Sequence, residues 1–270
     1  MEDTQFRQIL NRFGFSWAGY RRVRKGIKKR LVRHMQLLHC RNIEEYIEAI
    51  EKDRKKRLQF ERRMAVSISR FFRDRGLWEI MQERMLPLLA SKARHVIKIW
   101  FAGCASGEEV YSFKILWEGL RKSYHCISDI CALATDMSPV FIERAKTAVY
   151  SYSSMKEVPR EFLSTYFEKF TGEKYALKSE MRDGVVWQVH HLLSDPPGTA
   201  FDLIFLRNNL LTYYRDEVKI PAIIKVVSSL VPGGFLIIGS HERVPIEIVD
   251  LKPWGGSTFI FQKQYRNRDG

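Results

Sequence analysis

The sequence has few cysteines and no long apolar run. Its cysteines, Cys40, Cys104, Cys126 and Cys131, are scattered over 270 residues without a Cys-x-x-Cys pair. This spacing argues against a disulfide framework and against a cysteine zinc site. No apolar run approaches the roughly 20 residues that cross a bilayer, and the polar segment from Glu2 onward has no signal-peptide core. We therefore expect a cytoplasmic protein with reduced thiols and no membrane insertion.

Acidic residues are too few to balance the basic ones in the first quarter of the chain, and the sequence has no internal repeat or low-complexity segment. The net charge is +14, and residues 1–63 hold 18 Lys or Arg against 8 Asp or Glu. Such basic asymmetry favours an acidic partner, namely nucleic acid, a membrane surface or an acidic protein. A solvated helical face is the alternative interpretation.

Residues 1–90 have helical patterns. From Tyr20 to Leu38, the apolar stripe of Val23, Ile27, Leu31 and Met35 is surrounded by Arg21, Arg22, Lys25, Lys28, Lys29 and Arg33. Such a helix buries one edge and presents a basic surface. We expect an all-helical N-terminal domain over 1–75, with helix 20–35 as the partner-docking surface, and a linker helix over 76–94.

From Val96 onward, strand and helix patterns alternate, which predicts an α/β domain over 95–270 with a parallel sheet covered on both faces. The expected strands are 96–102, 131–136, 184–191, 202–206, 233–239 and 257–263, and the expected helices are 108–121, 138–148 and 215–230. A Pro232-Gly-Gly234 turn is expected before the fifth strand. The interval of about 158–190 breaks the alternation and predicts a small antiparallel β insertion.

Residues 100–112 predict a buried strand, a turn bounded by Gly103 and Gly107, and a helix that begins with Glu108 and Glu109. Glycines allow a ligand to approach the backbone closely. A helix N-terminus usually favours an anion, but two acids already occupy this one. The arrangement therefore favours a cationic ligand with hydroxyl groups, such as S-adenosylmethionine, although a plain strand-to-helix turn is the alternative.

A second acid follows the next strand. The segment Cys131-Ala-Leu-Ala-Thr-Asp136 is short and apolar and ends in a carboxylate, with Pro139 close behind at a helix start. In a doubly wound sheet, an acid at this place binds the ribose hydroxyls of a nucleotide. A helix N-cap is the alternative role of Asp136.

Several motifs in this order resemble the chemotaxis-receptor methyltransferases, the CheR family. They are Ser67-Ile-Ser-Arg-Phe-Phe-Arg-Asp74, the loop of residues 100–112, Ala134-Thr-Asp-Met-Ser138, and the segments 201–214 and 231–242. The resemblance implies a Rossmann-like domain that binds S-adenosylmethionine, carries a small β insertion and follows a helical domain. It also implies methyl esterification of protein glutamate side chains, with S-adenosylhomocysteine as the product.

The resemblance also implies site residues. The cofactor contacts would be Ser67, Ser69, Arg73, Gly103, Gly107, Glu109, Asp136, His191, Leu192, Arg207 and Asn208. Arg73 would contact the methionine carboxylate beside the methyl-transfer site, and Tyr213 would shape the pocket, so these two are the candidate catalytic residues. The chain departs from the family at Ser67 and Ser69, at His191, where the family has Asn, and at Thr212, where it has Tyr.

The implied reaction makes modest demands. A glutamate of pKa about 4.3 is ionised at neutral pH, so no general base is needed. Catalysis then comes from alignment and exclusion of water. We expect a monomer that acts on an acidic helical protein, such as the cytoplasmic domain of a chemoreceptor.

Two other functions remain open. Ser194-Asp-Pro-Pro197 superficially resembles a motif of nucleic-acid amino-methyltransferases, but Gly198 stands where that motif has an aromatic residue. Alternatively, the chain binds the cofactor or its product and signals without catalysis. The departures from the family motifs at His191 and Thr212 suggest this alternative. Because of Gly198, we expect no nucleic-acid partner. We also expect no metal, because His190 and His191 would point to opposite faces of a strand.

Overall fold

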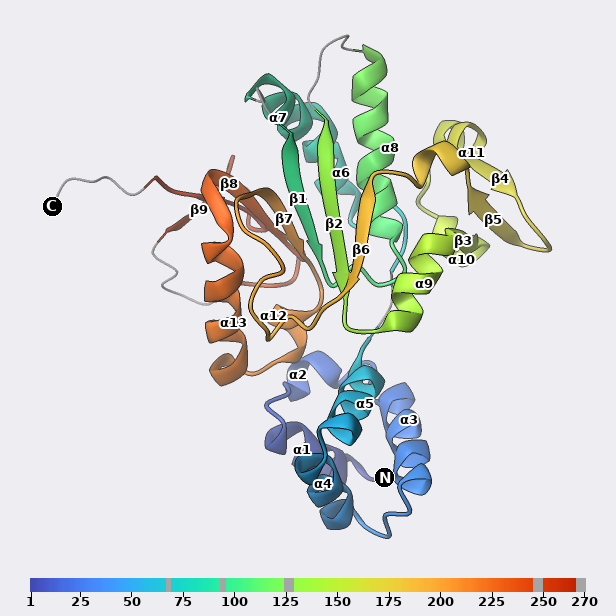
Figure 1. Cartoon of the computed structure of the whole chain (residues 1–270), viewed down its shortest axis with the longest axis vertical. Helices are drawn as coiled ribbons and strands as arrows, with labels where there is room; N and C mark the ends of the chain where they lie inside the picture. Colours follow the sequence, from blue (N-terminus) through green and yellow to red (C-terminus); the bar gives the residue numbers. More distant parts are fainter. Residues whose placement is uncertain (67–68, 93–95, 124–128, 245–249, 266–270) are drawn as a thin grey trace, which may run out of the picture.

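The computed structural model describes residues 1–66, 69–92, 96–123, 129–244 and 250–265. Ser67 and Cys126 therefore lie outside the described residues. Figure 1 shows a helical N-terminal region at one end of a large sheet, and a small second sheet beside it. Within the described ranges, no helix is both long enough and apolar enough to cross a bilayer.

The N-terminal region consists of α1 (Asp3–Arg12), α2 (Trp17–Tyr20), α3 (Arg24–Leu37), α4 (Ile43–Lys52) and α5 (Arg54–Met64). These helices enclose a core of their own that includes Phe6, Leu10, Tyr20, Leu31, Tyr46 and Phe60. Asn42 caps α4 by accepting a hydrogen bond from the N–H of Glu45 at 2.8 Å. The basic helix expected over 20–35 is interrupted after Tyr20 and begins again at Arg24.

The next helical segment belongs to the sheet's core and is not an isolated linker. It comprises α6 (Arg75–Ile80), the π-helical turn η1 (Met81–Met85) and α7 (Leu86–Lys92). Its buried side chains, which include Leu77, Trp78 and Met85, pack in the same apolar cluster as Ile99 of β1.

The large sheet has the order β6-β2-β1-β7-β8-β10-β9. Its strands are β6 (Val185–Val189), β2 (Ile130–Asp136), β1 (Ile97–Ala102), β7 (Phe201–Leu206), β8 (Leu230–Ile238), β10 (Ile260–Lys263) and β9 (Leu251–Pro253). The first five are parallel, and β10 is antiparallel to both β8 and β9. β9 was not expected from the sequence.

Helices cover both faces of this sheet, as the alternating pattern predicted. Ile99 and Phe101 of β1 pack in the cluster that holds α6, α7 and α8 (Glu108–Ser123). Trp100 and Ala102 face the opposite cluster, with α12 (Leu210–Tyr213) and α13 (Asp216–Ser228). Because successive side chains of a strand point to opposite faces, β1 is buried on both. α9 (Pro139–Thr147) contacts β2 and β6.

The insertion is a three-stranded antiparallel sheet in the order β3-β5-β4. Its strands are β3 (Val149–Ser151), β5 (Lys174–Leu177) and β4 (Phe167–Lys169), with α10 (Tyr152–Met155) and α11 (Arg160–Tyr166) between β3 and β4. The expected range of 158–190 misses β3 and includes β6. That strand belongs to the large sheet because Val185–Val189 pairs in parallel with β2.

Pro232-Gly-Gly234 does not precede the fifth parallel strand but lies inside β8. Phe201 pairs with Leu230, whereas Leu203 pairs with Phe235, so the Pro-Gly-Gly segment bulges out of register. Proline and glycine inside strands commonly mark such irregularities.

The strand order places a topological switch between β1 and β7. The chain passes from β1 outward to β2 and β6 on one side, and returns to β7 and β8 on the other. Ligands of open α/β sheets bind at the carboxyl ends of the strands at such a point. The fold therefore predicts a site where the turns after β1, β2, β6 and β7 meet.

Candidate active site

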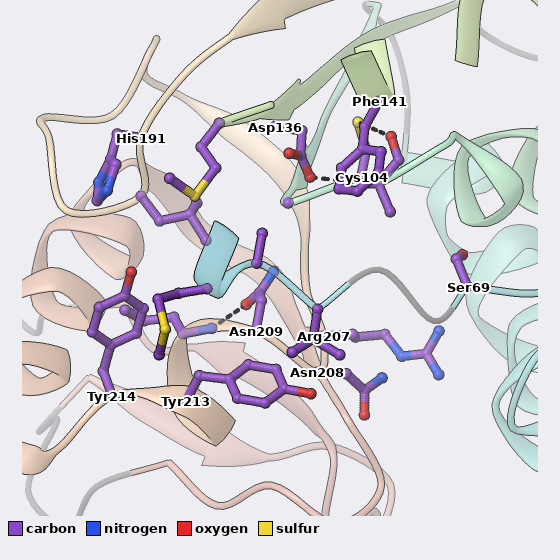
Figure 2. A pocket seen from close by; sticks show the side chains of 18 of the residues that line it. Ser69, Cys104, Asp136, Phe141, His191, Arg207, Asn208, Asn209, Tyr213 and Tyr214 are labelled. Carbon is purple, nitrogen blue, oxygen red and sulfur yellow. Dashed lines mark hydrogen bonds between the residues drawn. The ribbon is translucent and has the colours of Figure 1, made fainter. Parts of the chain in front are cut away.

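A cavity lies at this place, between the carboxyl ends of the strands and the helical region. Figure 2 shows Asp136 and Phe141 across it from Tyr213 and Tyr214. The sheet side is lined by Gly103, Cys104, Ala105, Glu109, Asp136, Met137, Phe141, His190, His191, Leu192, Arg207, Asn208, Asn209, Leu210, Tyr213 and Tyr214. The helical region and the segment after it contribute Phe15, Tyr20, Glu61, Met64, Ala65, Val66, Ser69, Arg70 and Arg73.

The turn after β1 forms the floor of the cavity. The N–H groups of Gly103 and Cys104 both donate to the carbonyl of Thr135 at 2.8 Å. Gly103 has φ +84°, and a Cβ there would collide with the side chain of Asn209. That side chain donates to the carbonyl of Ala102 at 2.6 Å. Only glycine allows both the backbone conformation and this close approach.

Asp136 is held rigidly at the end of β2. Its Oδ2 accepts from the N–H of Ala105 at 3.0 Å, and its Oδ1 accepts from the N–H of Ser138 at 2.9 Å. Burial raises the pKa of Asp136, and these two N–H groups offset the rise only in part. Each carboxylate oxygen has a further lone pair that a ligand hydroxyl can use.

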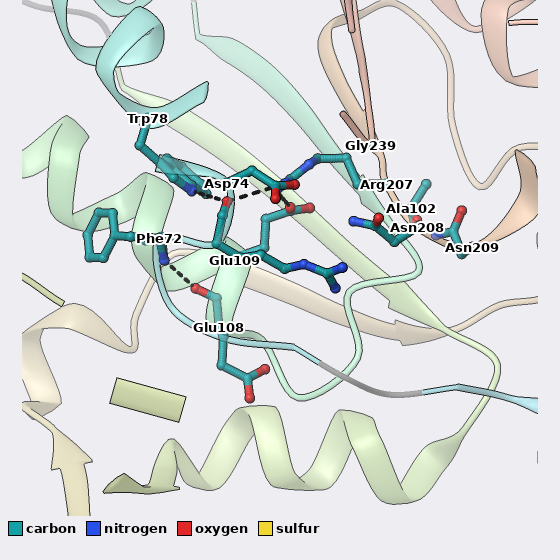
Figure 3. A network of polar contacts seen from close by, with 12 residues as sticks. Phe72, Asp74, Trp78, Ala102, Glu108, Glu109, Arg207, Asn208, Asn209 and Gly239 are labelled. Atoms are coloured by element: carbon teal, nitrogen blue, oxygen red, sulfur yellow. Dashed lines mark hydrogen bonds and ion pairs between the residues drawn. The ribbon is translucent and has the colours of Figure 1, made fainter. Parts of the chain in front are cut away.

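A buried ion network joins three segments of the wall (Figure 3). Arg207, whose side chain is 3% exposed, donates to Glu109 at the start of α8 and to Asp74 at 2.6 Å. It also donates to the carbonyl of Arg73 at 3.3 Å. Burial alone would lower the pKa of Arg207, but the two carboxylates outweigh it and raise that pKa. Burial raises the pKa of Glu109.

Arg73 lies in a strained turn of the backbone. Its neighbours Phe72 and Asp74 have φ +52° and +64°, which side-chain-bearing residues rarely adopt. The Phe72 N–H donates to the Ser112 hydroxyl at 2.9 Å, and the indole of Trp78 donates to the Arg73 carbonyl at 2.9 Å. These contacts hold the turn and direct the Arg73 side chain to the cavity wall. Strain of this kind persists only where the surroundings enforce it.

Tyr213 connects the sheet to the helical region. Its ring lies 4.8 Å from that of Tyr20, and its carbonyl accepts from the N–H of Ser16 at 2.9 Å. Burial raises the pKa of Tyr213, and the nearby positive charge of Arg73 opposes this rise. Tyr213 and Arg73 are therefore neighbours in the same wall.

His191 makes a second connection between the two parts. Its Nδ1 accepts from the N–H of Leu193 at 3.1 Å, and its Nε2 lies 3.3 Å from Glu61 Oε2. Arg57 donates to the other oxygen of Glu61 at 2.7 Å. Burial acts to raise the pKa of Glu61, but His191 and Arg57 together hold it below its usual value.

Most of the site residues expected from the sequence meet in this cavity. Those that line it are Ser69, Arg73, Gly103, Glu109, Asp136, His191, Leu192, Arg207, Asn208 and Tyr213. Gly107 does not line it. Its Cβ position would lie 3.0 Å from both Ala145 and Trp187, so this glycine allows α8 to begin close to α9 and β6.

Sequence reasoning missed several lining residues and Asp74, a partly buried acid that pairs with Arg207 of the wall. Asn209 and Asp74 directly follow the expected residues Asn208 and Arg73, and this adjacency in sequence is the signal that could have predicted them. Glu61, Met64 and Tyr20 come from the helical region, and no local pattern indicated that they would reach the sheet.

The wall suits S-adenosylmethionine. The Gly103 turn leaves bare backbone, Asp136 and Glu109 offer acceptors, and Met64, Phe141 and Leu192 offer apolar surface. The buried Nε of Arg207 has no hydrogen-bond partner among the described residues. Nowhere in the described ranges do three or more His, Cys, Asp or Glu side chains gather as a metal would require.

Comparisons with known proteins agree with this geometry. Residues 67–258 match the family described as CheR methyltransferase, SAM binding domain. The chain is 34% identical over 201 residues to a chemotaxis protein methyltransferase of Listeria innocua, covering 74% of each chain. It is 30% identical over 240 residues to that of Listeria monocytogenes, covering 88% of each.

Two further similarities differ in extent. An uncharacterised 104.1 kDa protein of Rhodobacter capsulatus is 30% identical over 220 residues, and the match spans 81% of this chain but only 23% of that protein. A TehB-like SAM-dependent methyltransferase structure from Corynebacterium glutamicum has TM-score 0.37 and 18% identity, covering 70% of this chain and 92% of that one. The family match decides the assignment: the chain belongs to the CheR methyltransferase family and contains its S-adenosylmethionine-binding domain.

The Gly103 turn generates a prediction. Gly103→Ala should displace Asn209 and force a residue with a Cβ to adopt positive φ, which costs about 1–3 kcal/mol. We expect weaker binding of S-adenosylhomocysteine, by about tenfold or more if that cost falls on the bound state. Isothermal titration calorimetry measures the affinity.

The matched control is Gly119→Ala in α8, where a Cβ would meet no atom within 4 Å. Alanine has the higher helix propensity, so this variant should bind normally and be slightly more stable. Equal affinity in both variants would contradict the role of the Gly103 turn.

Proposed function

We propose that this protein uses S-adenosylmethionine to methylate glutamate side chains of a chemoreceptor-like protein. The observation that carries the proposal is the wall in which Arg73, Glu109 and Arg207 stand at one side of a cavity and Asp136 at another, in a member of the CheR family. The names of the Listeria relatives support chemotaxis methylation as the setting.

The assigned binding roles follow from chemistry. Asp136 would accept hydrogen bonds from the ribose hydroxyls, and His191 and Leu192 would border the adenine. Glu109 would face the ammonium group of the methionine part, and Arg73 its carboxylate. A planar guanidinium matches a carboxylate better than lysine does. Ser69, Arg207 and Asn208 complete the proposed contacts.

When bound, S-adenosylmethionine supplies an electrophilic methyl group on a sulfonium. The residues of this chain would then orient and desolvate the substrate. Arg73 would hold the incoming glutamate carboxylate in line, and Tyr213, packed on Tyr20, would keep the wall closed to water. No proton transfer is required, because the glutamate is already ionised.

An acidic partner fits the outer face of α3. Lys25, Lys29 and Arg33 are exposed at i, i+4 spacing on one side of this helix. Other cations of α3 are engaged internally: Lys28 pairs with Asp3 at 2.8 Å, and Arg30 donates to the carbonyl of Ala65 at 2.8 Å. The three exposed cations are therefore the proposed docking surface.

Transfer of labelled methyl groups tests the proposed function. The protein is incubated with methyl-labelled S-adenosylmethionine and membranes that contain chemoreceptors, and base-labile label on receptor glutamate is measured. We expect labelling by the wild type and at least a hundredfold less by Arg73→Ala, since loss of an oriented charge contact in the transition state costs about 3 kcal/mol or more.

Arg75→Ala is the matched control, because the Arg75 side chain is 89% exposed and pairs at the surface with Glu79, at 2.8 Å. It should label normally. Cofactor binding without any labelling would favour a non-catalytic cofactor-binding protein. Label on nucleic acid would favour a nucleic-acid methyltransferase. Near-normal turnover by Arg73→Ala would remove Arg73 from its assigned role.

The docking surface gives a separate prediction. The triple variant Lys25→Glu, Lys29→Glu and Arg33→Glu should weaken binding to an acidic receptor fragment by tenfold or more at low salt, because it replaces attraction with repulsion. Affinity for S-adenosylhomocysteine should not change. Surface plasmon resonance and calorimetry measure the two affinities.

The control carries the same change of charge at exposed lysines away from the helical region: Lys98→Glu, Lys146→Glu and Lys252→Glu. If both triple variants lose the same receptor affinity, net charge and not the α3 surface governs docking.

A further inference from the structure

Glu242 is a buried acid that follows β8 and lies behind the cavity wall. It is 8% exposed. Its Oε2 accepts from the backbone N–H of Asn208 at 2.8 Å and of Gly239 at 2.7 Å. Its Oε1 accepts from the hydroxyl of Thr212 at 2.6 Å. Three donors from the ends of β7, β8 and α12 thus converge on one carboxylate.

The segment that Glu242 supports is strained and lines the cavity. Asn208 has φ +55° and lies between Arg207, which holds the ion network, and Asn209, which packs on Gly103. A side-chain-bearing residue in this conformation needs surroundings that enforce it. The charge-assisted hydrogen bond to its N–H is one such constraint.

The approach of β8 to this segment also depends on a small residue. A Cβ on Gly239 would lie 2.8 Å from both Glu242 Oε2 and Asn208 Oδ1. The glycine therefore leaves room for the carboxylate to bridge the ends of β7 and β8. The same carboxylate fixes the first turn of α12, because Thr212 is bound to it and Tyr213 follows directly.

We propose that Glu242 is a positioning residue for the cofactor cavity. It holds Asn208 and α12 so that Asn208 and Tyr213 face the cavity in the arrangement that binds S-adenosylmethionine. Glu242 itself is not among the described residues that line the cavity. This inference rests on the proposed function, because it concerns the binding of that cofactor.

The test uses two substitutions of similar size, Glu242→Leu and Glu242→Gln, in the full chain. Leucine removes every acceptor and leaves two buried N–H groups unpaired, so we expect the Kd for S-adenosylhomocysteine to rise at least tenfold. Glutamine keeps the shape and one acceptor oxygen but loses the charge, so we expect a rise of about threefold or more, smaller than that for leucine. Calorimetry measures Kd, and thermal unfolding measures stability.

Lys263→Met is the matched control for lost stability. Its Nζ donates to the carbonyls of Val227 at 2.9 Å and Leu230 at 2.7 Å, so its replacement removes partly buried hydrogen bonds at a place away from the cavity. This variant should unfold at a lower temperature but bind with the Kd of the wild type. If Glu242 had a purely structural role, its variants would also unfold at a lower temperature and keep the Kd of the wild type.

The outcomes separate the two claims. If the wild type binds S-adenosylhomocysteine and both Glu242 variants bind it with the Kd of the wild type, the positioning role is overturned and the proposed function stands. If Glu242→Leu does not fold, Glu242→Gln decides, and an unchanged Kd overturns the inference. If the wild type itself binds neither S-adenosylmethionine nor S-adenosylhomocysteine, the proposed function and this inference both fall.

Discussion

The buried guanidinium of Arg207 is the constraint on which the cavity depends. It holds together the end of β7, the start of α8 through Glu109, and the Arg73 turn through Asp74. A single buried cation with two carboxylates is stable only while all partners remain, because breaking such a pair costs about 3–5 kcal/mol. The network therefore fixes three segments that are distant in sequence, and it does so at the switch point where a ligand of this fold binds.

The helical region completes the cavity, and it is coupled to the sheet at residues that line the site. Ser16 donates to the carbonyl of Tyr213, and Arg215 donates to that of Gly14 at 2.9 Å. Tyr213 and Tyr214 pack against the apolar core of the helical region. A partner that docks on α3 would thus press on the same packed unit that forms one wall, so docking and cofactor binding have a physical route to influence each other.

The sequence predicted the layered α/β fold well because β1 and β7 are apolar segments of strand length, each with a single charged residue, and the helices have clear periodicity. The predicted fold and family are confirmed. The predicted extent of the insertion was wrong because Val185–Val189 has a strand pattern that fits either sheet. Only its pairing with β2 shows that it belongs to the large sheet. β9 is three residues long, which is too short for a periodic signal.

For the site, local motifs were sufficient where the chemistry is local. Gly103 follows β1, Glu109 lies in the first turn of the next helix and Asp136 ends β2, and their residue types alone indicated a cationic ligand with hydroxyl groups. Glu61 and Glu242 could not be predicted in this way, because each contributes through a contact with a distant segment: His191 for Glu61, and Asn208 with Thr212 for Glu242. At two of the four departures from the family pattern, His191 and Thr212, the side chain lies against an acid of this chain.

The charges of the molecule divide into two physical classes. Glu109, Asp136 and Arg207 are largely removed from solvent and bound by fixed partners, so salt screens them little. The cations on the outer face of α3 are exposed, and at physiological ionic strength their reach is limited to about 8 Å. Salt should therefore change the electrostatics of the cavity little, whereas attraction between the α3 cations and an acidic partner would weaken as the salt concentration rises.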